Sequence, residues 1–382
     1  MTVPLHSKVQ NLPALTSLRF AAALMIVLLH ASNSLAWTWL DFGRMPLVQG
    51  VSFFFVLSGF ILTHVYESKE MLSLPAFMRA RYARLWPVHA LAIVFLVLAV
   101  APDSITFDGR GIFDKWVVLG LNLSLLHSVF PFLAYTFSWN SVSWSVSTEI
   151  FFYLAFPYLL VNIERTWHWK LLLAAVLAGA LIAGLKLAGL PIHSSDFNQA
   201  TATFATYPNP LMRGFEFVLG MSTCVIWRKY LKQASLSIGW WTAIEVAALA
   251  TCGWWMHQGF WLMKLHLPNE WVALFIGPAG SCWAFALLIG CLASGRGYVG
   301  KALSVRPLVF LGEISFSMYM LHLILIKVFV TTLAWKDVPP FYYFAALFFL
   351  SSASYLLVEK PAQRLLVGKL RRPWRWHASA SR

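Results

Sequence analysis

The chain has 382 residues, of which 59% are hydrophobic and 12% are charged, and its mean hydropathy is +0.68. Because soluble domains carry about a quarter charged residues, this composition excludes an ordinary soluble protein and indicates a polytopic membrane protein. The net charge of +14 lies mostly in short loops between apolar runs, which is typical of membrane topology rather than of nucleic-acid binding. We expect membrane lipids around the chain and no nucleic-acid partner.

Apolar segments long enough to cross a bilayer recur along the chain. They cover roughly residues 15–36, 47–66, 85–101, 143–162, 170–190, 211–227, 239–257, 271–293, 309–331 and 341–358. Lysine and arginine gather in alternate loops, which predicts cytoplasmic N- and C-termini. Segment 116–133 is apolar but contains Asn122, His127 and Pro131, so we expect a re-entrant or interfacial piece of an external loop. The predicted fold class is an all-α bundle of about ten transmembrane helices.

Three regions follow from this layout: a cytoplasmic segment 1–14, a membrane-embedded domain 15–361 and a basic cytoplasmic tail 362–382. The first span loosely resembles a secretory signal peptide, but its long N-terminal region and the spans that follow favour an uncleaved helix. The four cysteines lie in apolar segments without CxxC spacing, at Cys224, Cys252, Cys282 and Cys291. We expect buried thiols and no metal site.

The first span, LTSLRFAAALMIVLLHASNSLA, carries two ionisable residues, Arg19 and His30. Ionisable groups inside a membrane are costly and usually functional. Eleven residues make about three helical turns, so both side chains share one face, about 16 Å apart along the axis. The pair is suited to a long ligand with an anionic head and a reactive far end, although a lone histidine in an apolar helix is often only a packed residue.

The segment MRARYARLWP at 78–87 places Arg79, Arg81 and Arg84 in the first predicted cytoplasmic loop. Guanidinium groups bind phosphates with paired hydrogen bonds, so these arginines beside Arg19 suit a polyphosphate. Binding of lipid headgroups by the same arginines is an equal alternative.

The segment SWSVSTE opens the fourth span and contains Trp144, Ser145 and Glu149. Ser145 and Glu149 are four residues apart and share one helical face. We expect Glu149 at the depth of His30, where a carboxylate would orient an imidazole that acts as a general base. The alternative is a buried pair that only fixes helix packing.

A polar stripe in the ninth span is formed by Ser315, Tyr319 and His322, with i, i+4, i+7 spacing. Such a stripe faces the bundle interior, where it lines a ligand cavity or holds helices together. In the second span, GVSFFFVLSGFIL at 50–62 contains Ser52 and two glycines that permit close helix approach. We expect Ser52, Trp144, Ser145, Ser315, Tyr319 and His322 to surround the substrate cavity.

Together these motifs resemble acyltransferase family 3, the integral-membrane O-acyltransferases of bacteria. The resemblance rests on Arg-x10-His at 19–30, on 50–62, 79–87, 143–149 and 314–323, and on Glu359-Lys360-Pro361. Any one motif is weak, but their order along nearly the whole chain is specific. No GxSxG, Walker, HExxH or GxGxxG pattern supports another enzyme class. Family members often carry an extra span and a fused extracytoplasmic domain, and this chain looks like the stand-alone type.

The resemblance implies transfer of an acyl group, commonly acetyl, from cytoplasmic acyl-CoA to a hydroxyl at the outer face of the bacterial inner membrane. His30 and Glu149 would act in transfer, and Arg19, Arg79, Arg81 and Arg84 would bind the donor. We expect acyl-CoA and a carbohydrate or glycolipid acceptor as substrates, without a tightly bound cofactor. Direct transfer is favoured over a covalent acyl-enzyme, because no serine or cysteine has the setting of a nucleophile. A proton-coupled transporter of an anionic metabolite is the alternative from another class.

Overall fold

The computed structural model describes residues 11–37, 39, 41–66, 73–100, 113–196, 198–267 and 269–367. Most of the predicted N-terminal segment 1–14 and of the basic tail 362–382 lies outside these residues. Throughout the described residues the regular secondary structure is helical, without a β-strand. The all-α prediction is therefore confirmed.

The longer helices are α1 (Pro13–Ser34), α2 (Gly50–Tyr66), α3 (Leu74–Ala99), α6 (Trp144–Leu160), α7 (Ile163–Leu187), α9 (Pro210–Ile226), α10 (Ile238–Trp254), α13 (Cys282–Leu292), α15 (Arg306–Lys327) and α16 (Pro340–Ser354). The shorter ones are α4 (Lys115–Leu123), α5 (Leu133–Phe137), α8 (Ala202–Thr206), α11 (Phe260–His266), α12 (Glu270–Ala279), α14 (Tyr298–Leu303) and α17 (Lys360–Val367). Single 3₁₀ turns are η1 (Leu47–Gln49), η3 (His127–Val129) and η4 (Ser141–Ser143), and π-helical turns are η5 (Trp227–Leu231), η6 (Trp255–Gly259), η7 (Val328–Thr332) and η8 (Tyr355–Glu359).

Within the described residues, seven helical stretches are long and apolar enough to cross a membrane. They are Pro13–Ser34, Leu47–Tyr66, Leu74–Ala99, Ile163–Leu187, Glu270–Leu292, Arg306–Thr332 and Pro340–Leu366. The other three predicted spans correspond to α6, α9 and α10, which have 17 residues each. The protein is therefore an integral membrane protein, while the count of ten spans and the side of the termini stay predictions.

Two local expectations are corrected. The arginine-rich segment 78–87 is not a loop, because α3 begins at Leu74 and continues through Pro87 to Ala99. Alanine, arginine, leucine and methionine are strong helix formers, and the charges hid this part of the helix from a reading based on hydropathy. The motif Glu359-Lys360-Pro361 at the end of the last predicted span would be expected to close that helix, because proline disrupts a helix. Instead, η8 passes into α17 without a break. By contrast, α4 has nine residues and α5 has five, so no single helix spans the membrane at 116–133.

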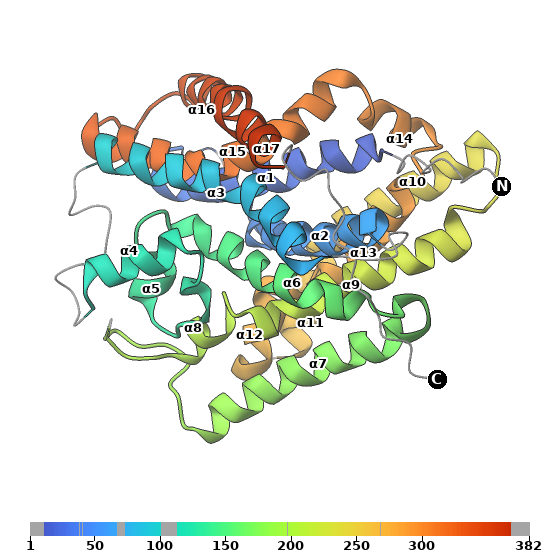
Figure 1. Cartoon of the computed structure of the whole chain (residues 1–382), viewed down its shortest axis with the longest axis horizontal. Helices are drawn as coiled ribbons and strands as arrows, with labels where there is room; N and C mark the ends of the chain where they lie inside the picture. Colours follow the sequence, from blue (N-terminus) through green and yellow to red (C-terminus); the bar gives the residue numbers. More distant parts are fainter. Residues whose placement is uncertain are drawn as a thin grey trace.

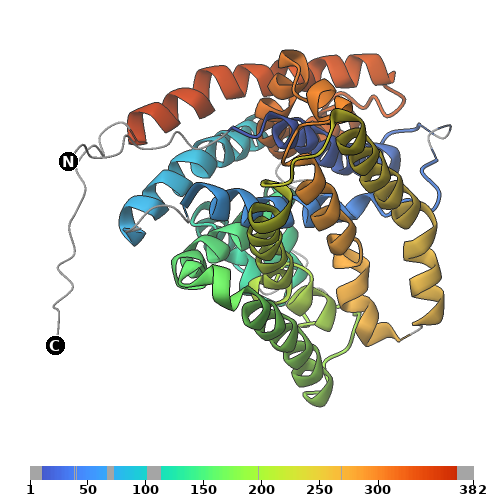
Figure 2. The same cartoon turned by 90° about the vertical axis from the view of Figure 1, so that its right-hand side faces the viewer.

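The centre of the bundle is formed by α2, α6, α9 and α13 (Figure 1). Above them in this view lie α1, α3, α15, α16 and α17, and α7 runs along the opposite edge. Figure 2 shows α16 and α17 as one long rod at the top of the molecule, far from α7 at the bottom.

The closest helix crossings need glycine. A Cβ atom on Gly312 of α15 would lie 1.8 Å from the carbonyl oxygen of Thr16 in α1. Similarly, a Cβ on Gly59 of α2 would lie 1.9 Å from the carbonyl oxygen of Phe217 in α9, and one on Gly220 would lie 1.8 Å from that of Val56. Backbone contact of this kind is possible only without a side chain. The expectation that the glycines of 50–62 serve helix packing is confirmed at Gly59.

Helices that surround the site run in matched directions. In α1 and α15, Thr16 is beside Gly312 and His30 is beside His322, so the two helices are parallel. In α2 and α6, the ring of Phe55 contacts that of Trp144, and the ring of Tyr66 contacts that of Phe156, so these helices are parallel as well. Equivalent residues of each pair therefore lie at similar depth in the membrane.

Candidate active site

A pocket of about 170 Å³ lies among α1, α2, α3, α6 and α15. Its polar lining side chains are Thr16, Arg19, Ser58, Arg81, Arg84, Ser145, Glu149, Tyr153 and Tyr319. Arginines gather toward one end, and the hydroxyls of Ser145 and Tyr319 mark the other. Apolar residues such as Phe54, Phe55 and Leu62 form the wall between them.

Three of the four predicted donor arginines line this pocket, and Arg79 does not. Arg81 and Arg84 are three residues apart on α3 and share one face, whereas Arg79 points away from Arg81 because two residues rotate a helix by about 200°. Arg79 is exposed. Its assignment to the donor site is therefore not supported by its position.

Arg81 and the other two pocket arginines differ in how they are held. The guanidinium of Arg81 donates a hydrogen bond to the hydroxyl of Tyr66 at 3.3 Å and lies 5.6 Å from the ring centroid of Phe77. Arg19 and Arg84 form no side-chain hydrogen bond or ion pair with any described residue. Arg84 acts electrostatically on Arg19, and Glu149 and Glu359 act on both. Two unpaired guanidinium groups thus face the same pocket.

Glu149 belongs to this arginine end. Its carboxylate oxygen Oε1 accepts hydrogen bonds from Ser58 Oγ at 2.7 Å and from the hydroxyl of Tyr153 at 2.5 Å. No hydrogen bond joins Glu149 to His30 among the described residues, so the predicted pairing of these two residues is not seen in this structure. Periodicity gave the face of each helix correctly but could not tell which helices are neighbours.

The partner of His30 is another histidine, His322 of α15. His30 Nδ1 lies 2.9 Å from His322 Nε2, and the two rings stack with centroids 5.1 Å apart and an interplanar angle of 25°. His322 is fully buried and its Nδ1 lies 2.6 Å from the carbonyl oxygen of Tyr319. The predicted polar stripe therefore reaches His30 through His322, although neither histidine lines the pocket.

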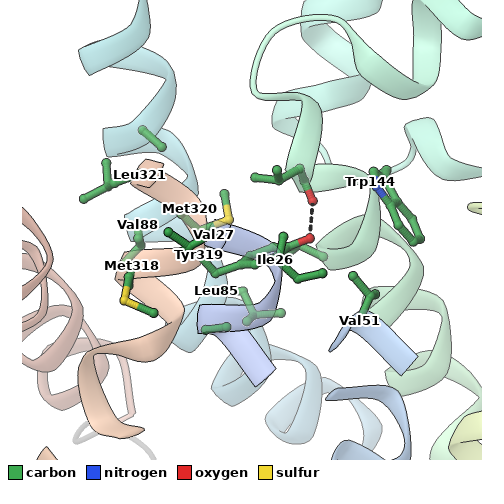
Figure 3. Close-up of a cluster of buried hydrophobic side chains, with 14 of the residues drawn as sticks. Ile26, Val27, Val51, Leu85, Val88, Trp144, Met318, Tyr319, Met320 and Leu321 are labelled. Atoms are coloured by element: carbon green, nitrogen blue, oxygen red, sulfur yellow. Dashed lines mark hydrogen bonds between the residues drawn. The ribbon is translucent and has the colours of Figure 1, made fainter. Parts of the chain in front are cut away.

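Tyr319 lies between the pocket and this histidine pair. Its hydroxyl is 2.8 Å from Ser145 Oγ and donates a hydrogen bond of 3.1 Å to the carbonyl oxygen of Val142. Figure 3 shows Tyr319 among Ile26, Val27 and Met318, with the hydrogen bond of its hydroxyl drawn as a dashed line. The ring centroids of Tyr319 and His322 are 5.7 Å apart.

The remaining predicted cavity residues, Ser52, Trp144 and Ser315, are buried and do not line the pocket. Ser315 Oγ donates to the carbonyl oxygen of Gly312 at 2.8 Å, a local bond that serine commonly forms within helices. A polar residue on the predicted face can thus pack within the bundle instead of lining the pocket. Its spacing in the sequence does not distinguish these two outcomes.

Sequence reasoning missed four residues around the pocket. Ser58 and Tyr153 hold Glu149, and Tyr153 follows Glu149 by one helical turn, which is the signal that could have found it. Glu359 accepts a hydrogen bond of 3.0 Å from Ser317 Oγ and acts electrostatically on Arg19 and Arg84. Arg213 is fully buried in α9 and paired with Glu216. The four cysteines are buried and form no disulfide with a described residue, which confirms their expected burial.

A family model described as an acyltransferase domain matches residues 12–360. The chain belongs to acyltransferase family 3. This assignment supports the first of the two classes of function that the sequence left open. The protein is a membrane O-acyltransferase.

Similar proteins carry consistent names. Acyltransferase MdmB of Streptomyces mycarofaciens is 30% identical over 345 residues, which cover 84% of this chain and 80% of that protein. Peptidoglycan O-acetyltransferase OatA of Listeria monocytogenes is 24% identical over 388 residues, covering 92% of this chain and 56% of OatA. A putative O-acetyltransferase of Staphylococcus aureus is 22% identical over 397 residues, covering 94% of this chain and 58% of its own length. The chain thus spans little more than half the length of the last two, and no solved structure matches it.

Proposed function

We propose that this O-acyltransferase takes an acyl group, acetyl in the first instance, from cytoplasmic acyl-CoA. It passes the group to a hydroxyl of a carbohydrate or glycolipid acceptor on the outer side of a bacterial inner membrane. The name of the Listeria relative, a peptidoglycan O-acetyltransferase, supports a carbohydrate acceptor. No tightly bound cofactor is part of this proposal.

The observation that carries the proposal is the pair of unpaired guanidinium groups of Arg19 and Arg84 in one pocket. A buried cation without a partner is expensive, and its cost is offset when an anion binds. Guanidinium and phosphate form short, paired, charge-assisted hydrogen bonds. The phosphates of coenzyme A are such anions, and Arg81, held against aromatic rings, is placed to assist.

The order of the side chains along α1 also suits a thioester donor, which has phosphates at one end and the acyl group at the other. From Arg19, α1 rises about 16 Å to His30, and the hydroxyls of Ser145 and Tyr319 lie between the two levels. Phosphates at the arginines would direct the acyl end of the donor toward Tyr319 and the histidines. Glu149, beside the arginines, would hold the donor site in shape rather than orient His30.

His30 would act as the general base in a direct transfer. The acceptor hydroxyl gives its proton to the imidazole, and the oxygen attacks the thioester carbonyl carbon. The carbon–sulfur bond then breaks, and the thiolate of coenzyme A receives the proton from the imidazole. A covalent acyl-enzyme is not needed, because the cysteines are buried away from the pocket and the hydroxyl of Ser145 is already engaged.

The test uses membranes that contain the protein, incubated with acetyl-CoA labelled on the acetyl carbon and with candidate glycan acceptors. Release of free coenzyme A and transfer of label are measured for the native chain and for His30→Ala. We expect both activities in the native chain, and a loss of at least about 100-fold in the variant, as for removal of a general base.

The matched control is His168→Ala, which replaces an exposed histidine of α7 and should leave both activities unchanged. Full activity in His30→Ala would refute the role of His30. Absence of coenzyme A release by the native chain, with acetyl and with longer acyl donors, would refute acyl-CoA as the donor.

A further inference from the structure

The hydrogen-bond chain that ends at His30 has a fixed direction. A carbonyl oxygen can only accept, so His322 Nδ1, which lies 2.6 Å from the carbonyl of Tyr319, must carry a hydrogen. In neutral His322 the other nitrogen, Nε2, is then an acceptor. The hydrogen in the 2.9 Å contact therefore belongs to His30 Nδ1. This leaves the lone pair of neutral His30 on Nε2.

The turn of α15 that carries His322 is held in place by three hydrogen bonds. Asn140 Nδ2 donates to the carbonyl of Met320 at 3.0 Å, and the hydroxyl of Tyr343 donates to the carbonyl of His322 itself at 3.2 Å. The hydroxyl of Tyr319 is bound to the loop carbonyl of Val142. These contacts come from the segment before α6 and from α16, so the position of His322 does not depend on its own helix alone.

The two histidines also differ in exposure. His322 is completely buried, whereas His30 is only half-buried. The His30 ring also interacts with the backbone carbonyl of Ile26, one turn earlier in α1. No side-chain partner of His30 Nε2 is found among the described residues, and Nε2 is not one of their buried unpaired atoms. The nitrogen that carries the lone pair is thus the one that no neighbouring side chain occupies.

We propose that His322 is the positioning residue of the acyl transfer, a neutral imidazole that performs for His30 the task usually given to a carboxylate. His322 fixes the Nδ1–H tautomer of His30 and its ring orientation, so that Nε2 is the base. When Nε2 takes the proton of the acceptor hydroxyl, the positive charge of His30 is stabilised through Nδ1–H by the acceptor nitrogen of His322. This inference rests on the proposed function for its chemistry and on the dyad geometry for its structure.

Three substitutions of His322 separate positioning from packing. Glutamine reaches about as far as the Nε2 atom of histidine and retains an acceptor for His30 Nδ1–H. Asparagine reaches only as far as Nδ1, and leucine retains neither polar atom. We expect His322→Leu and His322→Asn to lower kcat about 100-fold with an unchanged KM for acetyl-CoA, and His322→Gln to remain within about tenfold of the native kcat.

The coupling of the two histidines gives a second readout. Because His322 acts only through His30, the double variant His30→Ala/His322→Leu should be no less active than His30→Ala alone. Two independent roles would instead make the losses multiply. Equal folded yield of the variants in detergent, measured by size-exclusion chromatography, shows that the comparison concerns activity rather than folding.

The third readout does not require turnover. ¹⁵N NMR of the full chain labelled at histidine, with His30 assigned by His30→Ala, should show the Nδ1–H tautomer for His30 in the native protein and in His322→Gln. In His322→Leu the signal should change to a mixture of tautomers. A native His30 in the Nε2–H form, an unaltered tautomer in His322→Leu, or a kcat within about threefold of native in His322→Leu would each overturn the dyad. Failure of acyl-CoA turnover in the native chain would refute the proposed function while the tautomer result still decides the dyad.

Discussion

Two sites in the helical bundle contain arginine but differ in how the charge of the guanidinium group is neutralised. Arg213 forms a two-point ion pair with Glu216 of the same helix, with Nη2 3.0 Å from Oε1 and Nε 2.8 Å from Oε2. Its guanidinium also lies 5.1 Å from the ring centroid of Phe55 and 5.9 Å from that of Trp144. Arg19 and Arg84 have no such partner among the described residues and line the pocket instead.

The difference distinguishes a structural cation from one that awaits a ligand. A buried charge with an ion-pair partner contributes to the architecture of the core, and removal of one partner is costly. A cation that faces a pocket without a partner is stabilised only when an anion arrives, and its removal affects binding rather than folding. The same residue type therefore predicts opposite phenotypes at the two sites.

The largest effect is expected at the paired site. Glu216→Leu leaves the guanidinium of Arg213 buried without a counter-charge, which should lower the free energy of unfolding by about 3–5 kcal/mol. Thermal unfolding in detergent measures this loss. The double variant Arg213→Met/Glu216→Leu should recover most of the stability, because it removes both charges. If Glu216→Leu had native stability, burial of Arg213 would not require Glu216. The proposed difference between the paired and unpaired arginines would then be refuted.

The next effect is expected at the unpaired site. Arg84→Gln should raise the KM for acetyl-CoA by about 10- to 100-fold, because a hydrogen bond to a charged group contributes about 1.5–3 kcal/mol, and should leave the unfolding midpoint unchanged or higher. Steady-state release of coenzyme A measures it. Arg79→Gln is the control, since Arg79 belongs to the same helix but is exposed outside the pocket, and its KM should match that of the native chain. If the two variants behaved alike, the pocket would not be the phosphate site.

The smallest effect is expected for substitution of Glu149, and it tests the role of this residue. Glu149→Gln retains an acceptor for Ser58 and Tyr153 but removes a negative charge beside Arg19 and Arg84. The KM for the anionic donor should therefore fall about three- to tenfold, because repulsion of about 1 kcal/mol is removed, while kcat stays within about threefold. Kinetics over a range of acetyl-CoA concentrations separate the two constants. A large loss of kcat with an unaltered KM would place Glu149 in the transfer step after all.

The sequence predicted the helical fold, the helix that carries Arg19 and His30 on one face, and the polar stripe of α15. Apolar runs and the 3.6-residue period are local properties of the chain, so they can be read without knowledge of its neighbours. The prediction from sequence failed for charged residues that lie within helices. The arginines of 78–87 were assigned to a loop, because a prediction based on hydropathy treats charged residues as loop residues.

Periodicity along the chain is therefore enough to show which residues share a helix and a face, including the three-turn separation of Arg19 and His30. Which faces meet depends on the packing of the helices. This packing paired His30 with His322 across the parallel helices α1 and α15, placed Glu149 with Ser58 and Tyr153 instead, and buried Ser52 and Ser315 outside the pocket. The physical reason is that helix geometry fixes direction within one helix, whereas contacts between helices depend on close packing at sites such as Gly312 and Gly59.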